Sequence, residues 1–469
     1  MRGLLLFVLV SLLAAGGALA VIAVLGRDDA PPASGPVTLD PDAPDPFAWD
    51  PDREEEFVAR ATAGHSHVLY EKSPGGVFAT AERVERWRPQ VEEVAASAGV
   101  EADELEAIIF LESAGYPDAR AGGDLRGAVG LTQILAETAT NFLGMRVDVD
   151  ASERLTRRIH RRGPSPALLA RRREIDERFD PKKALAAAGR YLRMADESLG
   201  REDLAVASYH MGIGNLQNVL AAYGEPDASW AQVYFDATPR SHPRAYRLLS
   251  GFGDDSATYL WRVYAAREIM RLFREDRAEL GRLAALQTAK ASAEEVLHPR
   301  TRTRIFETPE ELEEGYRDGE LRPFGGIPGL RADPQMGELA RRLDSERRLF
   351  RGLRPEAYAL AAYLSAGVRD VAGTKASLIA TSTVRDLSYQ RLLARSNAYA
   401  THDYSLHTTG YAFDIRRDYA SRAQAVAFEY MLDRLQSLDL IAWVREPAAI
   451  HITASREGAE LLPLLEDAQ

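Results

Sequence analysis

The spacing of apolar and polar positions predicts a helical first part and a mixed second part. From residue 59 to about 279, apolar side chains recur at the three- and four-residue intervals of helices, and strand-like alternation is scarce. From about residue 354 a helical stretch leads to the β-like runs SLIATSTV and YAFDI, and a second helical stretch leads to IAW and AIHIT. This order predicts a mainly α domain followed by a small α+β domain.

One carboxylate interrupts the apolar pattern of the first domain. In EADELEAIIFLE a helix would place Leu105, Ile108, Ile109 and Glu112 on one face. Glu112 thus stands where the pattern reserves a place for a buried side chain. A buried carboxylate without a partner is costly, so such groups are usually neutralised, paired or functional. Periodicity alone equally allows a half-exposed residue in the last helical turn that bonds to nearby backbone.

The N-terminal segment carries no charge between Leu4 and Gly26. As a helix rising ~1.5 Å per residue it would span roughly 34 Å, enough for a hydrocarbon core of ~30 Å. Arg2 precedes the segment and acidic residues follow it, which favours a chain that continues outside the cytoplasm. A cleavable signal peptide is the alternative, because residues 18–20 have the small-x-small form. The apolar run continues past residue 20, which favours an uncleaved anchor.

Composition sets the remaining boundaries. After the expected transmembrane anchor at 1–26, residues 27–56 hold seven prolines and ten acidic residues, a composition typical of a linker without a core. The helical domain is expected over 57–280. A polar connecting segment that contains PFGGIPG follows over 281–350, and the α+β domain occupies 351–469.

Charge and cysteine content narrow the possible chemistry. The formal net charge is −12, so no basic surface dominates and a nucleic-acid partner is not expected. The chain has no cysteine, which excludes disulfides, thiolate metal ligands and a cysteine nucleophile. A metal site would have to use histidine and carboxylate side chains.

Four stretches of the helical domain form a recognisable set. They are Glu112-Ser113 after the apolar helix, GAVGLTQI (127–134), GRYL (189–192) and ASYHMGIG (207–214). In order and spacing they resemble the lytic transglycosylases with a soluble-lytic, goose-lysozyme-like domain, over roughly residues 90–280. The resemblance implies a lysozyme-like domain that cleaves the MurNAc-GlcNAc bonds of peptidoglycan. His210 stands where that family usually has asparagine, which leaves the local hydrogen bonding open.

The same resemblance assigns roles to individual residues. It implies that Glu112 is a single catalytic acid and base, which helps the 6-hydroxyl of muramic acid attack its own anomeric carbon to give an anhydro sugar. Tyr209 would lie across the cleft beside the reacting sugar, and Ser113, Gly130 and Gln133 would bind substrate or orient the glutamate. A glutamate among apolar side chains retains its proton more readily, which suits an acid near neutral pH. The alternatives are structural roles: Tyr209 as a core tyrosine, Gln133 as the cap of a turn, and Gly130 as a residue that serves the backbone conformation.

A second set of candidate residues lies near the C-terminus. His407 and Asp414 are seven positions apart in SLHTTGYAFD, and His451 lies between two isoleucines in AIHIT. Two histidines and one aspartate can form an open zinc site that leaves positions for water and substrate. His402 is expected to be a loop residue rather than a ligand.

These stretches resemble the zinc D-alanyl-D-alanine carboxypeptidases and dipeptidases, whose motif S-x-H-x-x-G-x-A-x-D matches residues 405–414. The resemblance implies that the two histidines and the aspartate bind zinc, and that Arg385 contacts the substrate or its polarised carbonyl. The family has a catalytic glutamate three positions before its last histidine, where this chain has Ala448. Glu446 is the remaining candidate base. The alternatives are a domain that binds the wall without cutting it, or histidines that only satisfy hydrogen bonds in the core.

Together the two sets predict a peptidoglycan lytic transglycosylase held in the cell membrane by a single span, with its domains on the cell-wall side. The C-terminal zinc peptidase-like domain would bind or cut stem peptides. The expected partners are peptidoglycan and the membrane. The expected cofactor is Zn²⁺ in the C-terminal domain, with none in the transglycosylase domain. A non-catalytic cell-wall-binding scaffold and a water-using muramidase are the alternatives.

Overall fold

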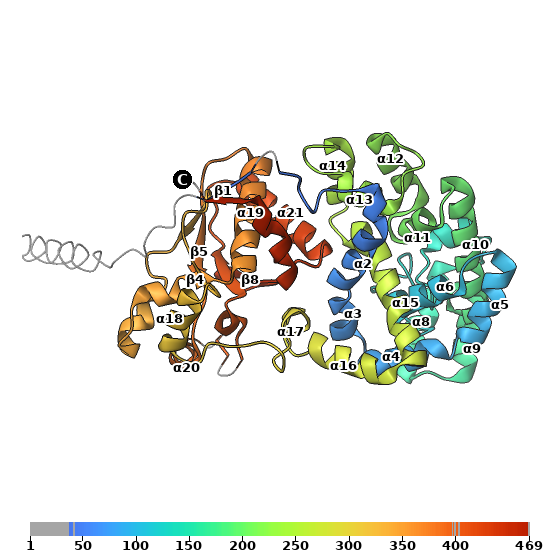
Figure 1. Cartoon of the computed structure of the whole chain (residues 1–469). Helices are drawn as coiled ribbons and strands as arrows, with labels where there is room; N and C mark the ends of the chain where they lie inside the picture. Colours follow the sequence, from blue (N-terminus) through green and yellow to red (C-terminus); the bar gives the residue numbers. More distant parts are fainter. Residues whose placement is uncertain (1–36, 41–42, 396, 398–399, 402–403, 468–469) are drawn as a thin grey trace, which may run out of the picture. The chain divides into compact units, whose positions relative to one another are not determined.

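The computed structural model describes residues 37–40, 43–395, 397, 400–401 and 404–467. They form two compact units (Figure 1). One comprises residues 44–299 and 426–444, and the other comprises residues 300–425, the residues from 445 on and those before 44. The expected anchor at 1–26 and His402 lie outside the described residues. Within the described part, no helix is both long enough and apolar enough to cross a membrane.

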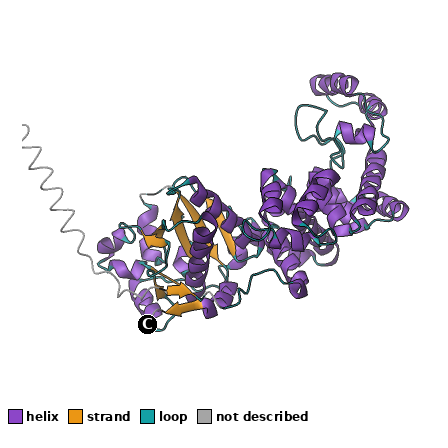
Figure 2. Ribbon diagram, turned by 90° about the horizontal axis from the view of Figure 1, so that it is seen from above, coloured by secondary structure: helices purple, strands orange, loops and turns teal. Residues whose placement is uncertain are grey.

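The first unit is built of helices and short connections, and the strands of Figure 2 are concentrated in the second. The helices of the first unit are α2 (Glu54–Gly64), α3 (His67–Lys72), α4 (Val77–Glu85), α5 (Arg88–Ala98), α6 (Ala102–Ser113), α7 (Ala136–Asn141), α8 (Val149–Arg162), α9 (Pro166–Ile175), α10 (Pro181–Leu199), α11 (Glu202–Met211), α12 (Ile213–Tyr223), α13 (Trp230–Asp236), α14 (Pro243–Gly251), α15 (Tyr259–Glu275), α16 (Arg277–Gln287) and α17 (Glu294–Leu297). Three single-turn helices join them: η1 (Pro51–Arg53), η2 (Glu177–Phe179) and η3 (Asp255–Thr258).

Helix α6 carries the interrupting carboxylate, and both of its ends follow from the sequence. Asp103 lies in its first turn, where a negative side chain interacts favourably with the helix dipole. The helix ends where Ala114 adopts a left-handed conformation with φ of 51° and Gly115 follows with φ of 81°. A Cβ atom on Gly115 would lie 2.9 Å from the backbone of Arg83, so the turn after α6 requires glycine.

The second unit combines a five-stranded sheet with helices. Its elements are β1 (Val37–Leu39), α18 (Pro309–Arg317), β2 (Arg322–Pro323), β3 (Leu330–Ala332), η4 (Glu338–Leu343), η5 (Arg347–Phe350), β4 (Gly352–Leu353), α19 (Pro355–Ala372), β5 (Leu378–Ser382), α20 (Leu387–Ala394), η6 (Leu406–Thr409), β6 (Ala412–Arg416), β8 (Ala449–Ala454), η7 (Arg456–Leu464) and β9 (Leu465–Asp467). The boundaries between the units fall within α21 (Arg422–Ser437) and at the end of β7 (Ile441–Arg445).

The sheet has the strand order β3-β5-β6-β8-β7. Strand β3 is parallel to β5, whereas the β5–β6 and β6–β8 pairs are antiparallel. Two small antiparallel pairs, β1 with β9 and β2 with β4, complete the unit. The prediction of a mainly helical N-terminal part and an α+β C-terminal part is confirmed.

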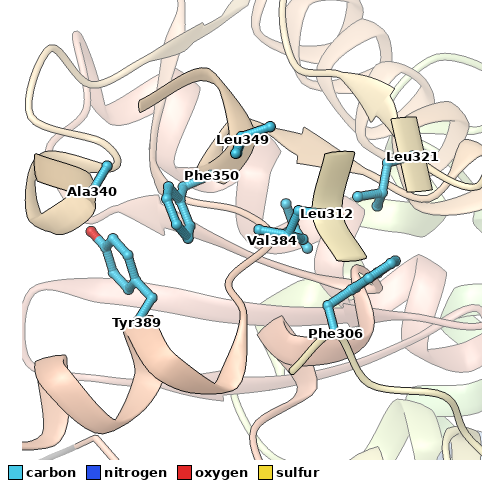
Figure 3. Close-up of a cluster of buried hydrophobic side chains, with 8 residues drawn as sticks. All are labelled: Phe306, Leu312, Leu321, Ala340, Leu349, Phe350, Val384 and Tyr389. Carbon is cyan, nitrogen blue, oxygen red and sulfur yellow. The ribbon is translucent and has the colours of Figure 1, made fainter. Parts of the chain in front are cut away.

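The interval 281–350, expected only as a connecting segment, contains elements of its own and contributes to the core of the second unit. A buried apolar cluster forms there (Figure 3). Its members are Phe306, Leu312, Leu321, Ala340, Leu349, Phe350, Val384 and Tyr389. Full burial of a large apolar side chain contributes about 1.5–3 kcal/mol, so this interval stabilises the unit and does more than connect.

Candidate functional site

Glu112 lies in the last turn of α6, on a helix that packs against α15, α5 and α4. Its apolar neighbours on the same helix, Leu105, Ile108 and Ile109, are completely buried. Glu112 itself keeps partial contact with solvent. The carboxyl group is therefore flanked by apolar side chains and still accessible to a ligand.

Tyr259, the first residue of α15, is the hydrogen-bond partner of this carboxyl group. Its hydroxyl donates to Oε1 of Glu112 over 2.7 Å. Burial raises the pKa of Glu112 to about 7, while the hydrogen bond from Tyr259 acts in the opposite direction. Burial dominates because protein atoms replace the water that would solvate the ionised form. Near neutral pH both protonation states are populated, as required of one group that gives a proton and later accepts one.

Tyr209, in α11, lies next to this pair. Its ring stacks on Tyr259 with centroids 6.3 Å apart, and Tyr191 meets it edge-on at 5.2 Å. Its hydroxyl donates to the carbonyl oxygen of Thr132 over 2.8 Å. Burial, followed by the charge of Glu112, raises the pKa of Tyr209 well above its usual value. Tyr209 is therefore close to Glu112 and remains a neutral donor at physiological pH.

His210, the departure from the transglycosylase pattern, lies against the same aromatic group. Its ring packs on Tyr259 with centroids 5.4 Å apart. Its Nδ1 shares a hydrogen bond of 2.9 Å with the hydroxyl of Ser256, in the short helix that leads into α15. The imidazole thus supports the start of the helix that carries Tyr259.

Ser113 and Gln133 direct their polar groups to the backbone. The hydroxyl of Ser113 donates to the carbonyl of Ile109 and accepts from the amide of Gly115, both over 3.2 Å. The Nε2 of Gln133 donates to the carbonyl of Gly130 over 2.7 Å. Gly130 and Gln133 have φ of 85° and 49°, a left-handed conformation that is uncommon for glutamine. These residues shape the end of α6 and the glycine-rich loop, and their contact with substrate stays a prediction.

Tyr259 is the residue of this site that sequence reasoning misses. It begins the run YLWRVYAAREIM, whose helical spacing accounts for each aromatic residue as part of the core. It lies 147 positions from Glu112, and only folding brings the two together. A buried carboxylate implies a donor, but the pattern does not select one tyrosine among several in the helical unit.

The second candidate site lies on the sheet of the α+β unit. His407 is in η6, Asp414 is in β6, and His451 is on the neighbouring strand β8, directly paired with Asp414. Directly paired residues of antiparallel strands project from the same face of the sheet. One ligand atom from each of the three residues lies within 4.8 Å of the other two. This group could hold a metal ion, and its three members are the residues that the sequence predicts as metal ligands.

The hydrogen bonds of His407 fit a metal ligand. Its Nδ1 lies 2.8 Å from the carbonyl oxygen of Thr383, which can only accept, so Nδ1 carries the proton. In the neutral ring the lone pair of Nε2 then faces Oδ1 of Asp414 at 3.2 Å. The Nδ1 of His451 approaches the same oxygen at 2.8 Å. A cation among these atoms would resolve the contact between two acceptors, and the backbone carbonyl would orient the ligand.

The charge states of these residues also fit a metal site. Burial, together with Arg385, lowers the pKa of His407 to about 4, so its ring is neutral at pH 7. Burial raises the pKa of Asp414, but the two neighbouring histidines outweigh it and hold this pKa well below its usual value. Neutral imidazole and ionised carboxylate are the forms that bind divalent metals, zinc among them.

Arg385 lies beside the metal-ligand group and is held by several partners. Its guanidinium donates to the hydroxyl of Ser382 over 2.7 and 3.0 Å and to Oε1 of Gln390 over 3.0 Å. One nitrogen also lies 3.4 Å from Oδ2 of Asp414. The arginine is therefore fixed beside the carboxylate of Asp414, and its contact with substrate stays a prediction.

Glu446, the candidate base, is in the turn between β7 and β8. Its amide donates to the carbonyl of Ala449 over 3.0 Å, so Pro447 and Ala448 form the tip of the hairpin. Among the described residues, the group of mutually close ligand atoms comprises His407, Asp414 and His451 and does not include Glu446.

A comparison with protein families identifies the domain around Glu112. Residues 90–230 match the family model of the transglycosylase SLT domain. The matched stretch contains Glu112, the loop 127–134 and Tyr209, and it implies lytic transglycosylase activity on peptidoglycan. No curated protein matches the chain. The family match ends at residue 230, so a zinc peptidase in the C-terminal unit stays a prediction.

Proposed function

We propose that the chain is a lytic transglycosylase that cleaves MurNAc-GlcNAc bonds and leaves an anhydro-muramic end, with Glu112 as its acid and base. The observation that carries the proposal is the carboxyl group of Glu112, whose pKa is raised to about 7 at the end of an apolar helix face within the matched domain. Burial and the hydroxyl of Tyr259 are the influences on this pKa. Most hydrolytic glycosidases use a pair of carboxylates, whereas the resemblance to lytic transglycosylases implies a single one.

The chemistry then follows from two proton transfers, one from Glu112 and one to it. Protonated Glu112 gives its proton to the glycosidic oxygen, the bond from C1 to that oxygen breaks, and positive charge develops at C1. The resulting carboxylate takes the proton of the muramic 6-hydroxyl while that oxygen bonds to C1. The 1,6-anhydro ring is formed, Glu112 is protonated again, and no water is consumed. Tyr209, whose hydroxyl proton is directed at the carbonyl of Thr132, would accept a hydrogen bond from a hydroxyl group of the reacting sugar.

The test is mass spectrometry of purified sacculi digested with the protein. The wild type should release anhydro-muropeptides, and Glu112→Gln should release none. Glu104→Gln is the matched control, because it makes the same change at another buried carboxyl of α6. Products with reducing ends would indicate a water-using muramidase. Wild-type protein that binds sacculi and releases nothing would indicate a scaffold.

The C-terminal unit supports a second activity. We propose that His407, Asp414 and His451 hold Zn²⁺ and that this unit binds or cuts the stem peptides of peptidoglycan. Zinc in such a site lowers the pKa of bound water and polarises a carbonyl. Arg385 would bind and orient the peptide at the ligand group, and Glu446 would accept the proton of the attacking water if the unit cuts.

Metal analysis and peptide release test this second proposal separately. Freshly purified protein should contain about one zinc per chain, and His407→Ala and His451→Ala should lose it while His160→Ala, an exposed position on α8, should keep it. Protein without metal would refute the zinc proposal. Peptide fragments that disappear in Glu446→Gln with zinc retained would show cutting, and their absence from wild-type digests would leave binding.

We also propose that residues 1–26 anchor the chain in the cell membrane and keep both units on the cell-wall side, where peptidoglycan is found. The proposal rests on the uncharged run from Leu4 to Gly26. Protease added to intact spheroplasts should degrade both units. Protein recovered in the soluble fraction without residues 1–20 would instead indicate a cleaved signal.

A further inference from the structure

A completely buried ion pair lies under the glycine-rich loop. Arg178 and Asp176 are both 0% exposed. Their contact is bidentate: Nε of Arg178 donates to Oδ1 of Asp176 and one terminal nitrogen donates to Oδ2, both over 2.9 Å. The hydroxyl of Ser152, in α8, donates to the same carboxylate over 2.9 Å. Neither charged residue belongs to the set of positions that suggested a transglycosylase.

The remaining hydrogen bonds described for the Arg178 side chain go to one loop. Its guanidinium donates to the carbonyl oxygens of Leu125 over 2.7 Å, of Gly127 over 3.0 Å and of Ile134 over 3.2 Å. These carbonyls lie at the start and the end of residues 125–134. The backbone of Arg178 supports the middle, because a Cβ on Gly130 would lie 1.9 Å from its carbonyl oxygen. Arg178 thus donates three hydrogen bonds to the loop and lies close against it at Gly130.

This loop is connected to the reacting groups. The carbonyl of Thr132 accepts the hydroxyl hydrogen bond of Tyr209 over 2.8 Å. Tyr209 stacks on Tyr259, which donates to Glu112. Displacement of the loop would move the acceptor that sets the direction of the Tyr209 hydroxyl beside the catalytic carboxyl.

Stability alone does not account for such a pair. A buried ion pair is often no more stabilising than apolar side chains of the same volume. A planar guanidinium, however, can serve a carboxylate and several carbonyls at fixed angles, which neither an apolar residue nor lysine can do. The arrangement is suited to hold one loop conformation.

We propose that Arg178, clamped by Asp176, is a positioning residue that holds residues 125–134 in the conformation in which Tyr209 is aligned with Glu112. The proposal rests on the transglycosylase function proposed above. Arg178 touches no substrate, so its loss should act on turnover rather than on binding. Misplacement of reacting groups by about 1 Å can cost roughly 100-fold in rate.

The test compares Arg178→Lys with Arg172→Lys in the full chain. Arg172 is 3% exposed, pairs with Asp118 and lies over the ring of Phe179. Within the described part of the chain, its side chain donates to Asp118 and not to the carbonyls of residues 125–134. Arg178→Lys keeps the charge and loses the fork. It should lower kcat on soluble glycan strands by roughly 10- to 100-fold, with KM changed less than about threefold. Arg172→Lys should leave kcat within about twofold of the wild type.

Hydrogen exchange of the amides of residues 125–135 gives a readout that does not depend on activity. Exchange there should accelerate in Arg178→Lys and not in Arg172→Lys. If Arg178→Lys does not fold, Asp176→Asn tests the same clamp, since it removes the charge that orients the guanidinium of Arg178 and should likewise accelerate exchange in the loop.

The outcomes separate the two proposals. A wild-type protein that forms no anhydro product contradicts the function, while the exchange measurement still tests the clamp. Wild-type exchange and wild-type kcat in Arg178→Lys would overturn the positioning role. An equal fall of kcat in both lysine variants would also overturn it, because general destabilisation would then explain the loss.

Discussion

Replacement of Tyr259 with phenylalanine removes the hydroxyl that donates to Oε1 of Glu112 and leaves the ring in place. The hydrogen bond favours the ionised carboxylate, and burial favours the protonated one. Without the hydroxyl, burial acts alone, so the pKa of Glu112 should rise above its value of about 7. Protonated Glu112 starts the reaction, so the variant should keep its activity to higher pH than the wild type.

The size of the expected rise in the pKa of Glu112 depends on how far this carboxyl group is exposed to water. A hydrogen bond to a charged group contributes about 1.5–3 kcal/mol. Glu112 is partly exposed, so water can replace part of it, and we expect a net effect of about 1.4 kcal/mol, or one pH unit. At pH 8 the protonated fraction would rise from roughly one-tenth to roughly one-half.

The assay is the pH dependence of kcat/KM for release of anhydro products from soluble glycan strands. This parameter reports the pKa values of the free enzyme. Tyr264→Phe is the matched control, because Tyr264 lies on the same helix and packs on Trp261 and Arg267. The basic limb of the profile should move up by roughly one unit in Tyr259→Phe only. An unchanged or lowered midpoint would refute the account of how this carboxyl is tuned.

Three further changes test other parts of the structure. Ile109→Thr places a hydroxyl at a fully buried position on the helix face of Glu112 and should move the basic limb of the pH profile to lower pH. An unchanged profile would mean that this face contributes packing and does not affect the pKa of Glu112. Gly130→Ala should lower the free energy of unfolding by about 2–4 kcal/mol in denaturant titrations, because the added Cβ would meet a backbone oxygen. Gly200→Ala is the control: Gly200 also has a positive φ but lies in open space, so this change should cost about 1 kcal/mol. Burial and a nearby acidic side chain raise the pKa of Glu104 to about 8, so this group destabilises the fold as pH rises from about 4.5 to 8. Glu104→Gln should therefore stabilise the protein on the order of 2 kcal/mol at pH 8.5 relative to pH 5, and an equal effect at both pH values would contradict the assignment.

The sequence predicts the helix that carries Glu112 because local spacing determines it. The expected helical stretch at residues 101–112 corresponds to α6, Ala102–Ser113. The strands with the metal-ligand residues are also visible as short β-branched runs, since YAFDI and AIHIT correspond to β6 and β8. In both cases the signal lies within a dozen residues, where period and propensity act.

The features that sequence reasoning misses depend on contacts between distant segments. Tyr259 joins Glu112 across 147 positions, and Arg178 joins Leu125 across 53. Nothing local distinguishes these residues from a core tyrosine or a surface arginine. The sequence predicts the interval 281–350 as a connection because its residues are polar and mixed and PFGGIPG interrupts it. Its apolar residues give no local sign of a core. They form a core only when the chain brings Val384 and Tyr389 to them.

The two influences on the proton affinity of Glu112, burial and the hydroxyl of Tyr259, also explain why a single carboxyl can suffice. A carboxyl kept protonated by burial alone would be a good acid and would leave an ionised form too costly to act next as a base. A carboxyl solvated by water would have the opposite limitation. Burial raises the cost of the charge, and the hydroxyl of Tyr259, 2.7 Å from Oε1, reduces it. The balance leaves the pKa at about 7, where the two protonation states are close in free energy and one group can perform both proton transfers.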